Sequence, residues 1–119
     1  MKVRIPQKIK IGATPAFIKY QENLMSDEGF HGTFNRRTGE LTLEAGCDGA
    51  KRDKTFGHEL MEVIKENYNL TIAEADMSNI ANGWLEFLNQ LGIEFDFEDI
   101  KICQSVKQRE KVLAVRLNQ

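Results

Sequence analysis

The sequence contains few residues of the kinds that cross-link a chain or anchor it in a bilayer. Its 119 residues include only two cysteines, and no apolar run approaches the length of a membrane span. Cys47 and Cys103 form no C-x-x-C pair, so free thiols are expected rather than a disulfide. Residues 1–10 are basic, but no apolar segment of about seven to fifteen residues follows, so no signal peptide is expected. These absences predict a cytoplasmic protein.

A charge excess of either sign is also missing. Lys and Arg number 16 and Asp and Glu number 18, which gives a formal net charge of -2, and both signs are mixed along the chain. Such a surface offers no electrostatic reason to bind nucleic acid or an acidic membrane, so we expect neither as a partner. A hydrophobic share of 41% at this length predicts a single domain, residues 1–119, with its own core.

Short runs of alternating apolar residues predict strands at both ends of the chain. Residues 3–11, interrupted by Pro6, are expected as one exposed strand or two fragments, and residues 17–20 as another. Residues 93–97 alternate again. The last segment, 107–119, fits either a helix or a strand, and its helix-favouring polar residues favour a helix.

The clearest local element is a β-hairpin. Residues 30–35 and 40–44 flank a turn in which Gly39 supplies the conformation that other residues resist. His31 then falls on the face opposite Phe30, and we interpret it as a solvent-facing strand residue rather than a metal or substrate ligand.

Residues 55–68 combine helical periodicity with reactive side chains, after a glycine-containing loop for which Asp53 or Thr55 is the expected N-cap. At about 100° per residue, apolar and polar side chains fall on opposite sides of this helix. The polar side consists of His58, Glu59, Glu62 and Glu66, and the apolar side of Phe56, Leu60, Val63 and Ile64.

His58 and Glu62 stand one turn apart, so both side chains reach a single point above the helix. This is the spacing of the H-E-x-x-H zinc helix, whose intervening Glu polarises a water molecule; here Glu59 intervenes and Glu62 replaces the second His. A carboxylate is a harder ligand than imidazole, so magnesium, calcium and manganese become candidates beside zinc. The alternative is a solvated acidic helix face that carries one His.

A second amphipathic helix is predicted to end at Gly92. Its apolar residues recur at intervals of three and four: Met77, Ile80, Ala81, Trp84, Leu85, Leu88 and Leu91. Trp84 is expected in the core. Glu74 and Asp76 occupy the first turn, where the helix dipole favours acids without any functional reason. Together the patterns predict an α+β fold in which a small antiparallel sheet, built from the N-terminal strands and the hairpin, packs on two main helices.

This order of elements resembles the small phage and mobile-element members of the ImmA/IrrE type of metallopeptidase, which are zincin-like. The resemblance is carried by a hairpin, a loop, a T-F-x-H-E-h-h-E helix and an L-x-h-x-E-x-x-h opening of the next helix, where h is apolar. It covers about residues 8–92 and assigns no role to residues 93–119, a C-terminal extension.

The resemblance implies a role for each residue that matches the motif. His58 is the first metal ligand, Glu59 matches the general base, Glu62 takes the place of the second ligand, and Glu74 falls where the third is expected. The implied cofactor is a divalent metal, with zinc as the first choice and manganese as the second. The implied substrate is a protein or peptide.

We therefore expect a metal-dependent hydrolase, and a small peptidase as its first form. An extended substrate is expected to pair with the strand edge at Leu41, Thr42 and Leu43. One alternative keeps the zincin scaffold without the chemistry, as a binding protein that acts on a host or regulatory protein. A third interpretation is a structural module with a solvated acidic face.

Overall fold

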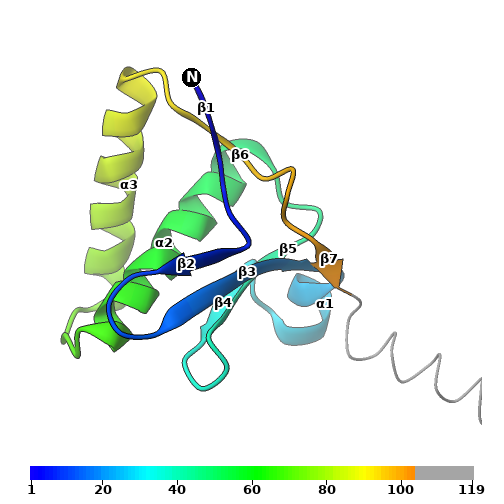
Figure 1. Ribbon diagram of the computed structural model, residues 1–119, viewed down its shortest axis with the longest axis vertical. Helices are drawn as coiled ribbons and strands as arrows, with labels where there is room; N and C mark the ends of the chain where they lie inside the picture. Colours follow the sequence, from blue (N-terminus) through cyan, green and yellow to red (C-terminus); the bar gives the residue numbers. More distant parts are fainter. Residues whose placement is uncertain (104–119) are drawn as a thin grey trace, which may run out of the picture.

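The computed structural model describes residues 1–103 of the protein (Figure 1). The strands are β1 (Lys2–Arg4), β2 (Lys8–Lys10), β3 (Pro15–Gln21), β4 (Gly32–Asn35), β5 (Glu40–Glu44), β6 (Glu94–Asp96) and β7 (Ile102–Cys103). The helices are α1 (Leu24–Glu28), α2 (Gly49–Asn67) and α3 (Glu74–Gln90). The predicted α+β class is confirmed. The helix expected over residues 107–119 lies outside the described residues.

The main sheet has five strands and is mixed rather than antiparallel. Its strands follow the order β2-β3-β5-β4, and β7 pairs with β3 beside β2. The β2–β3 and β4–β5 pairs are antiparallel, whereas β3 runs parallel to both β5 and β7. Because β3 and β5 run parallel, the chain must cross back to the end of the sheet where β3 began before it can form β5. The connection that does so contains α1 and β4.

The hairpin is present where it was predicted. β4 pairs with β5 so that Gly32 faces Leu43 and Asn35 faces Glu40. Gly39 has a φ of 78°, and a Cβ at this position would lie 2.8 Å from the carbonyl oxygen of Pro15. Glycine is therefore required at Gly39 for both conformation and space.

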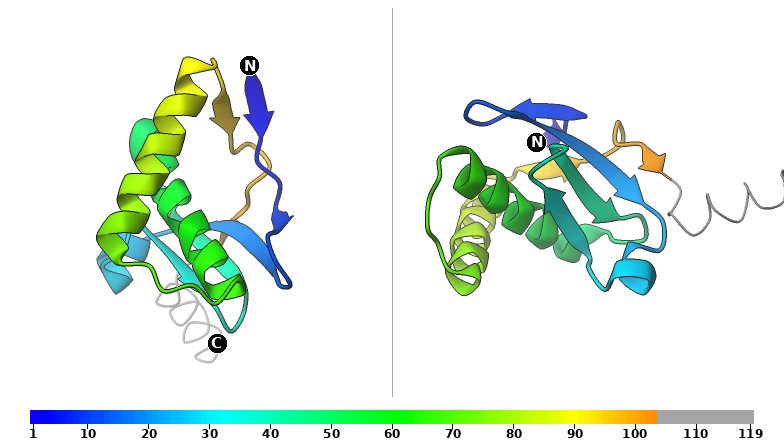
Figure 2. Two further views of the ribbon diagram at one scale, coloured as in Figure 1. Left: turned by 90° about the vertical axis from the view of Figure 1, so that its left-hand side faces the viewer. Right: turned by 90° about the horizontal axis from the view of Figure 1, so that it is seen from below.

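The two long helices form successive layers on one side of the sheet. Figure 2 shows α2 between the sheet and α3. Phe56 and Val63 of α2 are buried in one core cluster with Leu41 and Leu43 of β5, as the apolar side of the predicted helix requires. α3 packs on α2 where Gly57 faces Ala81: a Cβ added to Gly57 would lie 3.3 Å from that of Ala81.

Helix α2 begins at Gly49, six residues before its predicted start, so neither Asp53 nor Thr55 is the N-cap. Asp48 occupies that position. The hydroxyl of Thr55 donates instead to the carbonyl oxygen of Lys51, at 2.8 Å. This bond to the preceding turn is typical of a threonine inside a helix. It explains why Thr55, a residue type that often caps helices, can lie within α2.

Residues 93–103 belong to the core of the domain. β6 pairs in parallel with β1, and Phe97 and Ile100 are each 6% exposed. The ring of Phe97 meets that of Phe56 edge to face, with centroids 5.2 Å apart. The segment to which the motif assigns no role thus covers one end of α2.

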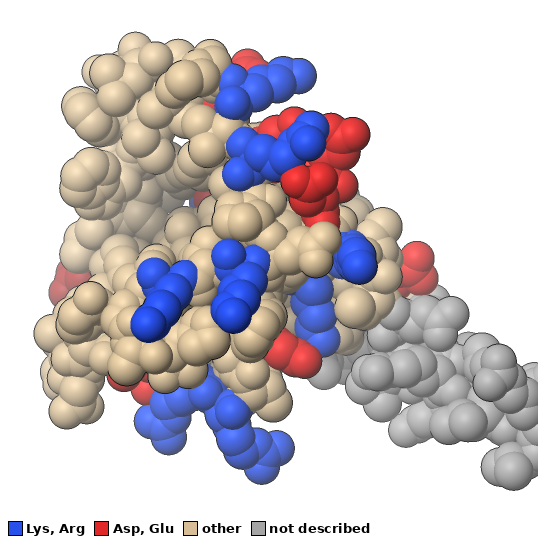
Figure 3. Space-filling view, viewed as in Figure 1, with Lys and Arg blue, Asp and Glu red and all other residues tan. Residues whose placement is uncertain are grey.

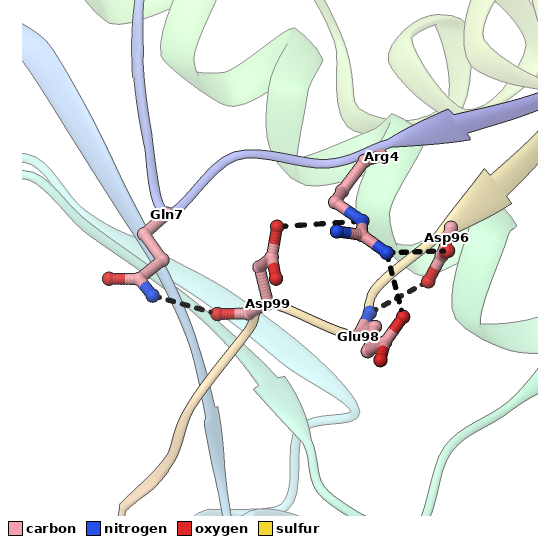
Figure 4. Close-up of polar contacts among 5 residues, drawn as sticks. All are labelled: Arg4, Gln7, Asp96, Glu98 and Asp99. Carbon is pink, nitrogen blue, oxygen red and sulfur yellow. Dashed lines mark hydrogen bonds and ion pairs between the residues drawn. The ribbon is translucent and has the colours of Figure 1, made fainter.

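A polar cluster fastens the N-terminal segment to this C-terminal one (Figure 4). The guanidinium of Arg4 lies 2.8 Å from Glu98, 3.6 Å from Asp99 and 3.9 Å from Asp96. Gln7 Nε2 donates to the carbonyl oxygen of Asp99 at 2.9 Å. Because most of these groups are exposed, the cluster orients the two segments more than it stabilises them.

Trp84 is not in the core, contrary to the prediction. It is 61% exposed, whereas Met77 and Ala81 of the same helix are 0% and 5% exposed. Ala81 and Leu85 face Gly57 of α2. Trp84 lies about 60° and 100° around the helix from them, on the side away from α2. Trp84 is only about 20° around the helix from Met77 but two turns further along. The apolar residues that predicted this helix therefore lie on two neighbouring faces of α3, one buried and one exposed.

Two smaller expectations concern cysteines and membranes. Cys47 is buried and Cys103 half-buried, and both thiols are free, as predicted. None of the helices within residues 1–103 combines the length and the apolar character that a membrane span requires.

Replacing Phe97 with alanine tests whether residues 93–103 are part of the core. We expect Phe97→Ala to lower the free energy of unfolding by about 3–5 kcal/mol, the cost of removing a buried aromatic ring. Phe17→Ala, at a ring that is 43% exposed, is the matched control and should cost far less. Urea unfolding followed by circular dichroism measures both, and equal losses would contradict the placement of Phe97.

Candidate metal centre

Two helices bring three potential metal ligands together. His58 and Glu62 project from α2, and Glu74 is the first residue of α3. Each offers one ligand atom, and these atoms all lie within 4.8 Å of one another. The i, i+4 spacing accounts for the first two. The third arrives because the 68–73 connection turns α3 back along α2, which the sequence could not show.

Both ring nitrogens of His58 have partners on α3. Nε2 lies 2.9 Å from a carboxylate oxygen of Glu74, and Nδ1 lies 2.9 Å from the hydroxyl oxygen of Ser78. Ser78 follows Glu74 by one helical turn, so the two residues share a face of α3. Sequence reasoning missed Ser78, although its position one turn after a proposed ligand was a usable signal.

The two carboxyl groups of the cluster affect each other's protonation. Burial raises the pKa of Glu62, and its hydrogen bond with Glu74 raises it further. The same hydrogen bond lowers the pKa of Glu74, and the nearby imidazole of His58 adds to the effect. When the two groups share a single proton, it therefore lies mainly on Glu62. A divalent cation would take the place of that proton.

The donors fit such a cation in type, charge and spacing. One imidazole and two carboxylates are an accepted set for zinc and for harder ions such as manganese. Two carboxylates balance a charge of +2. In a tetrahedral site with metal–ligand distances of about 2.0–2.1 Å, neighbouring ligand atoms lie about 3.3 Å apart. The 2.9 Å contact between His58 and Glu74 would therefore widen by a few tenths of an ångström, whereas the most distant pair, which lies within 4.8 Å, would close by up to about 1.5 Å.

Glu59 lies beside the cluster and is not one of its three donors. It is 8% exposed, and a Cβ added to Gly32 of β4 would lie 3.4 Å from its Cγ. Burial, followed by the negative charges of Glu62 and Glu74, raises the pKa of Glu59 to about 7. A carboxyl group of this kind exchanges protons near neutral pH.

An open cleft adjoins these residues. It has a volume of about 390 Å³ and is lined by Phe30, His31, Gly32, Lys54, Thr55, His58, Glu59, Ser78 and Asn82. His31 is half-buried in the wall of this cleft rather than fully turned to solvent, and it is not one of the three clustered donors. A larger hollow of about 510 Å³ lies by Arg52 and β6 and includes none of the donors.

The strand predicted to bind an extended substrate has no free edge. β5 is paired with β3 on one side and β4 on the other, and Leu41, Thr42 and Leu43 are at most 4% exposed. These three residues form the core instead, because the hairpin places β5 inside the sheet. Within residues 1–103, no strand pairs with the outer edge of β4. The first residue of β4, Gly32, lines the cleft.

Gly32 permits the close approach of this edge to the helix. A Cβ at position 32 would overlap the methyl group of Thr55 and approach Glu59. Glycine thus allows β4 to lie directly against the turn of α2 that carries the reactive side chains.

No protein-family model, curated protein or solved structure matches the chain. The resemblance to ImmA/IrrE-type peptidases therefore rests on the quoted motif alone, and the structure shows a His–Glu–Glu cluster that could hold a metal ion.

The raised pKa of Glu59 predicts a pH dependence of stability in metal-free protein. The folded state holds a proton on Glu59 up to about pH 7, whereas the unfolded chain releases it near 4.5. The folded state thus binds more protons in this window, so the free energy of unfolding falls as pH rises from about 4.5 to 7, by about 3 kcal/mol. Glu59→Gln removes the ionisable group and should remove this part of the decrease in the free energy of unfolding.

Urea unfolding at several pH values in the presence of a chelator measures the effect. The difference between wild type and Glu59→Gln isolates Glu59, since Glu62 and Glu74 titrate in both proteins. A difference that stays constant from pH 4.5 to 8 would rule out the raised pKa.

Proposed function

We propose that the protein is a divalent-metal-dependent hydrolase, and specifically a small peptidase of the zincin-like type. The carrying observation is the convergence of His58, Glu62 and Glu74 beside an open cleft that Glu59 also lines. Zinc is the proposed metal, with manganese as the alternative favoured by the two carboxylates.

Each residue of the proposed site has a distinct task. Once bound, the cation would polarise the substrate carbonyl group and lower the pKa of a water molecule. His58 would bind through Nε2 while its Nδ1–H donates to Ser78, which fixes the orientation of the ring. Glu59 would accept the proton of the attacking water and later deliver it to the leaving nitrogen.

The edge of β4 supports a peptide as the substrate class. An extended peptide can add to a sheet through main-chain hydrogen bonds, and β4 has an unpaired edge within residues 1–103. Because Gly32 lines the cleft, a peptide bound along β4 would lie close to His58 and Glu59. The proposed substrate contact is thus at β4 and not at β5, where the sequence predicted it.

A second candidate is a binding protein that uses the same cleft without hydrolysis. It is favoured by Glu62, since a carboxylate in place of imidazole leaves the metal a weaker Lewis acid. Such a protein would recognise a host or regulatory protein through the cleft and the β4 edge.

Metal content is the first test of the site. The full chain, purified without chelator and then equilibrated with Zn²⁺ or Mn²⁺, should hold close to one ion per molecule by elemental analysis. His58→Ala should lose it. His31→Ala is the matched control, because it removes the other histidine from the same cleft and should retain the metal. Absence of metal in the wild type after equilibration would refute the proposal of a metal-dependent hydrolase.

Glu59→Gln tests the chemistry separately from the binding. It should retain the metal and lower the hydrolysis of labelled casein at least about 100-fold, the usual contribution of a general base. Glu62→His, which completes H-E-x-x-H, should bind zinc more tightly than wild type. Hydrolysis unaffected by Glu59→Gln would remove Glu59 from the mechanism, and bound metal without any turnover would support the binding protein.

A further inference from the structure

Helix α3 carries a second apolar face that residues 1–103 leave uncovered. Its members, which we call the outer stripe, are Ile80, Trp84, Phe87 and Leu91, with exposed fractions of 42%, 61%, 51% and 58%. The rings of Trp84 and Phe87 meet edge to face at 6.0 Å. The stripe is therefore an ordered cluster of large side chains rather than a set of scattered ones.

The surroundings of the outer stripe are almost uncharged. In Figure 3, the column of side chains over α3, on the left, is nearly all tan. The helix contains only three charged residues and no basic one: Glu74, Asp76 and Glu86. Glu74 and Glu86 lie more than about 100° around the helix from the centre of the stripe, and Asp76 lies one turn before its first residue. Little charge opposes contact between two such faces.

The stripe also combines a hollow with a protruding ring. Ile80, Gly83, Trp84 and Phe87 line an apolar hollow of about 390 Å³. A Cβ added to Gly83 would meet nothing within 4 Å, so another helix can approach closely here. A bulky side chain from a facing helix would fill the hollow, and Trp84 is itself such a side chain.

The spacing of the stripe is symmetrical, which suits a second copy of the same helix as its occupant. The intervals from Ile80 to Trp84, Phe87 and Leu91 are four, three and four residues. In an antiparallel pair of α3 helices, Ile80 of one copy would face Leu91 of the other, and Trp84 would face Phe87. Each large apolar residue would thus meet another, as an isologous two-fold interface requires. We propose that the protein forms a homodimer through antiparallel contact of the outer stripes.

The exposed area is adequate for the centre of such an interface. Aromatic side chains bury about 150–250 Å² each, so the four half-exposed residues offer roughly 400 Å² per copy. A standard interface uses about 800 Å² per partner, of which the apolar core is the central part and a polar rim the remainder. The uncharged Asn79 and Gln90 beside the stripe supply such a rim. An interface of this size fits a dimer that dissociates on dilution.

Dimerisation would leave the candidate metal centre accessible. Ser78 and Asn82, which line the cleft, lie about 150° or more around α3 from the centre of the stripe. The proposal thus stands independently of the proposed chemistry, and each can fail without the other.

Analytical ultracentrifugation of the full chain tests the proposal. Over about 1–300 µM, the mass should rise from 13.6 kDa toward twice that value. Trp84→Glu should stay monomeric throughout, with an unchanged circular dichroism spectrum because Trp84 is exposed. Phe17→Glu is the matched control: it also charges an exposed ring, Lys8 lies 5.8 Å from that ring, and the dimer should persist. A monomeric wild type, or a dimer that survives Trp84→Glu, would overturn the proposal.

Cysteine cross-linking tests the antiparallel register. Ile80→Cys/Leu91→Cys should give a disulfide-linked dimer under mild oxidation, because positions 80 and 91 face each other between copies. Within one helix these positions are about 16 Å apart and cannot bond. Ile80→Cys alone is the control for the native Cys47 and Cys103, and it should cross-link at least about tenfold less. Equal cross-linking by the single variant would indicate a parallel pair and contradict the register.

Discussion

The candidate site depends on one close contact between two helices. A Cβ at Gly57 would lie 3.3 Å from that of Ala81, which is closer than ordinary van der Waals contact, so α3 would have to shift by a few tenths of an ångström. The same contact holds Glu74 and Ser78 against the ring of His58. Without it, α2 alone would offer one imidazole and one carboxylate, which is too few ligands for a firmly held ion. The packing of two small residues thus sets the ligand count.

The site concentrates negative charge more than a metal-free fold favours. Glu59, Glu62 and Glu74 affect one another's ionisation, and Glu59 is also buried. Burying an acid without a counter-charge destabilises a fold, and natural chains depart from local rules of this kind mainly at functional positions. His58 contacts Glu74, and the charge of Lys65 acts on Glu62 and Glu74. Within residues 1–103, however, no cation offsets the charge of Glu59. A bound divalent ion would supply the missing charge.

Local patterns in the sequence predicted the local structure well. Both long helices, the hairpin with its glycine and the pairing of His58 with Glu62 follow from spacing over a few residues. The parallel pairing of β3 with β5, the interior position of Leu41 to Leu43 and the core role of Phe97 depend on contacts between distant segments. Trp84 and Ser78 show the same limit, since periodicity marks an apolar or polar face but not what lies opposite it.

The pairing of β1 with β6 has a consequence for the order in which the chain acquires its structure. Lys2 pairs with Glu94, and the N-terminal ammonium group of Met1 donates to the carbonyl oxygen of Gly92 at 2.6 Å. During synthesis, the first strand emerges long before its partner, and loop closure over such a separation is slow. The hairpin and α2 can assemble early. β1 is therefore among the last strands to be fixed, and it stays unpaired until residues 94–96 have left the ribosome.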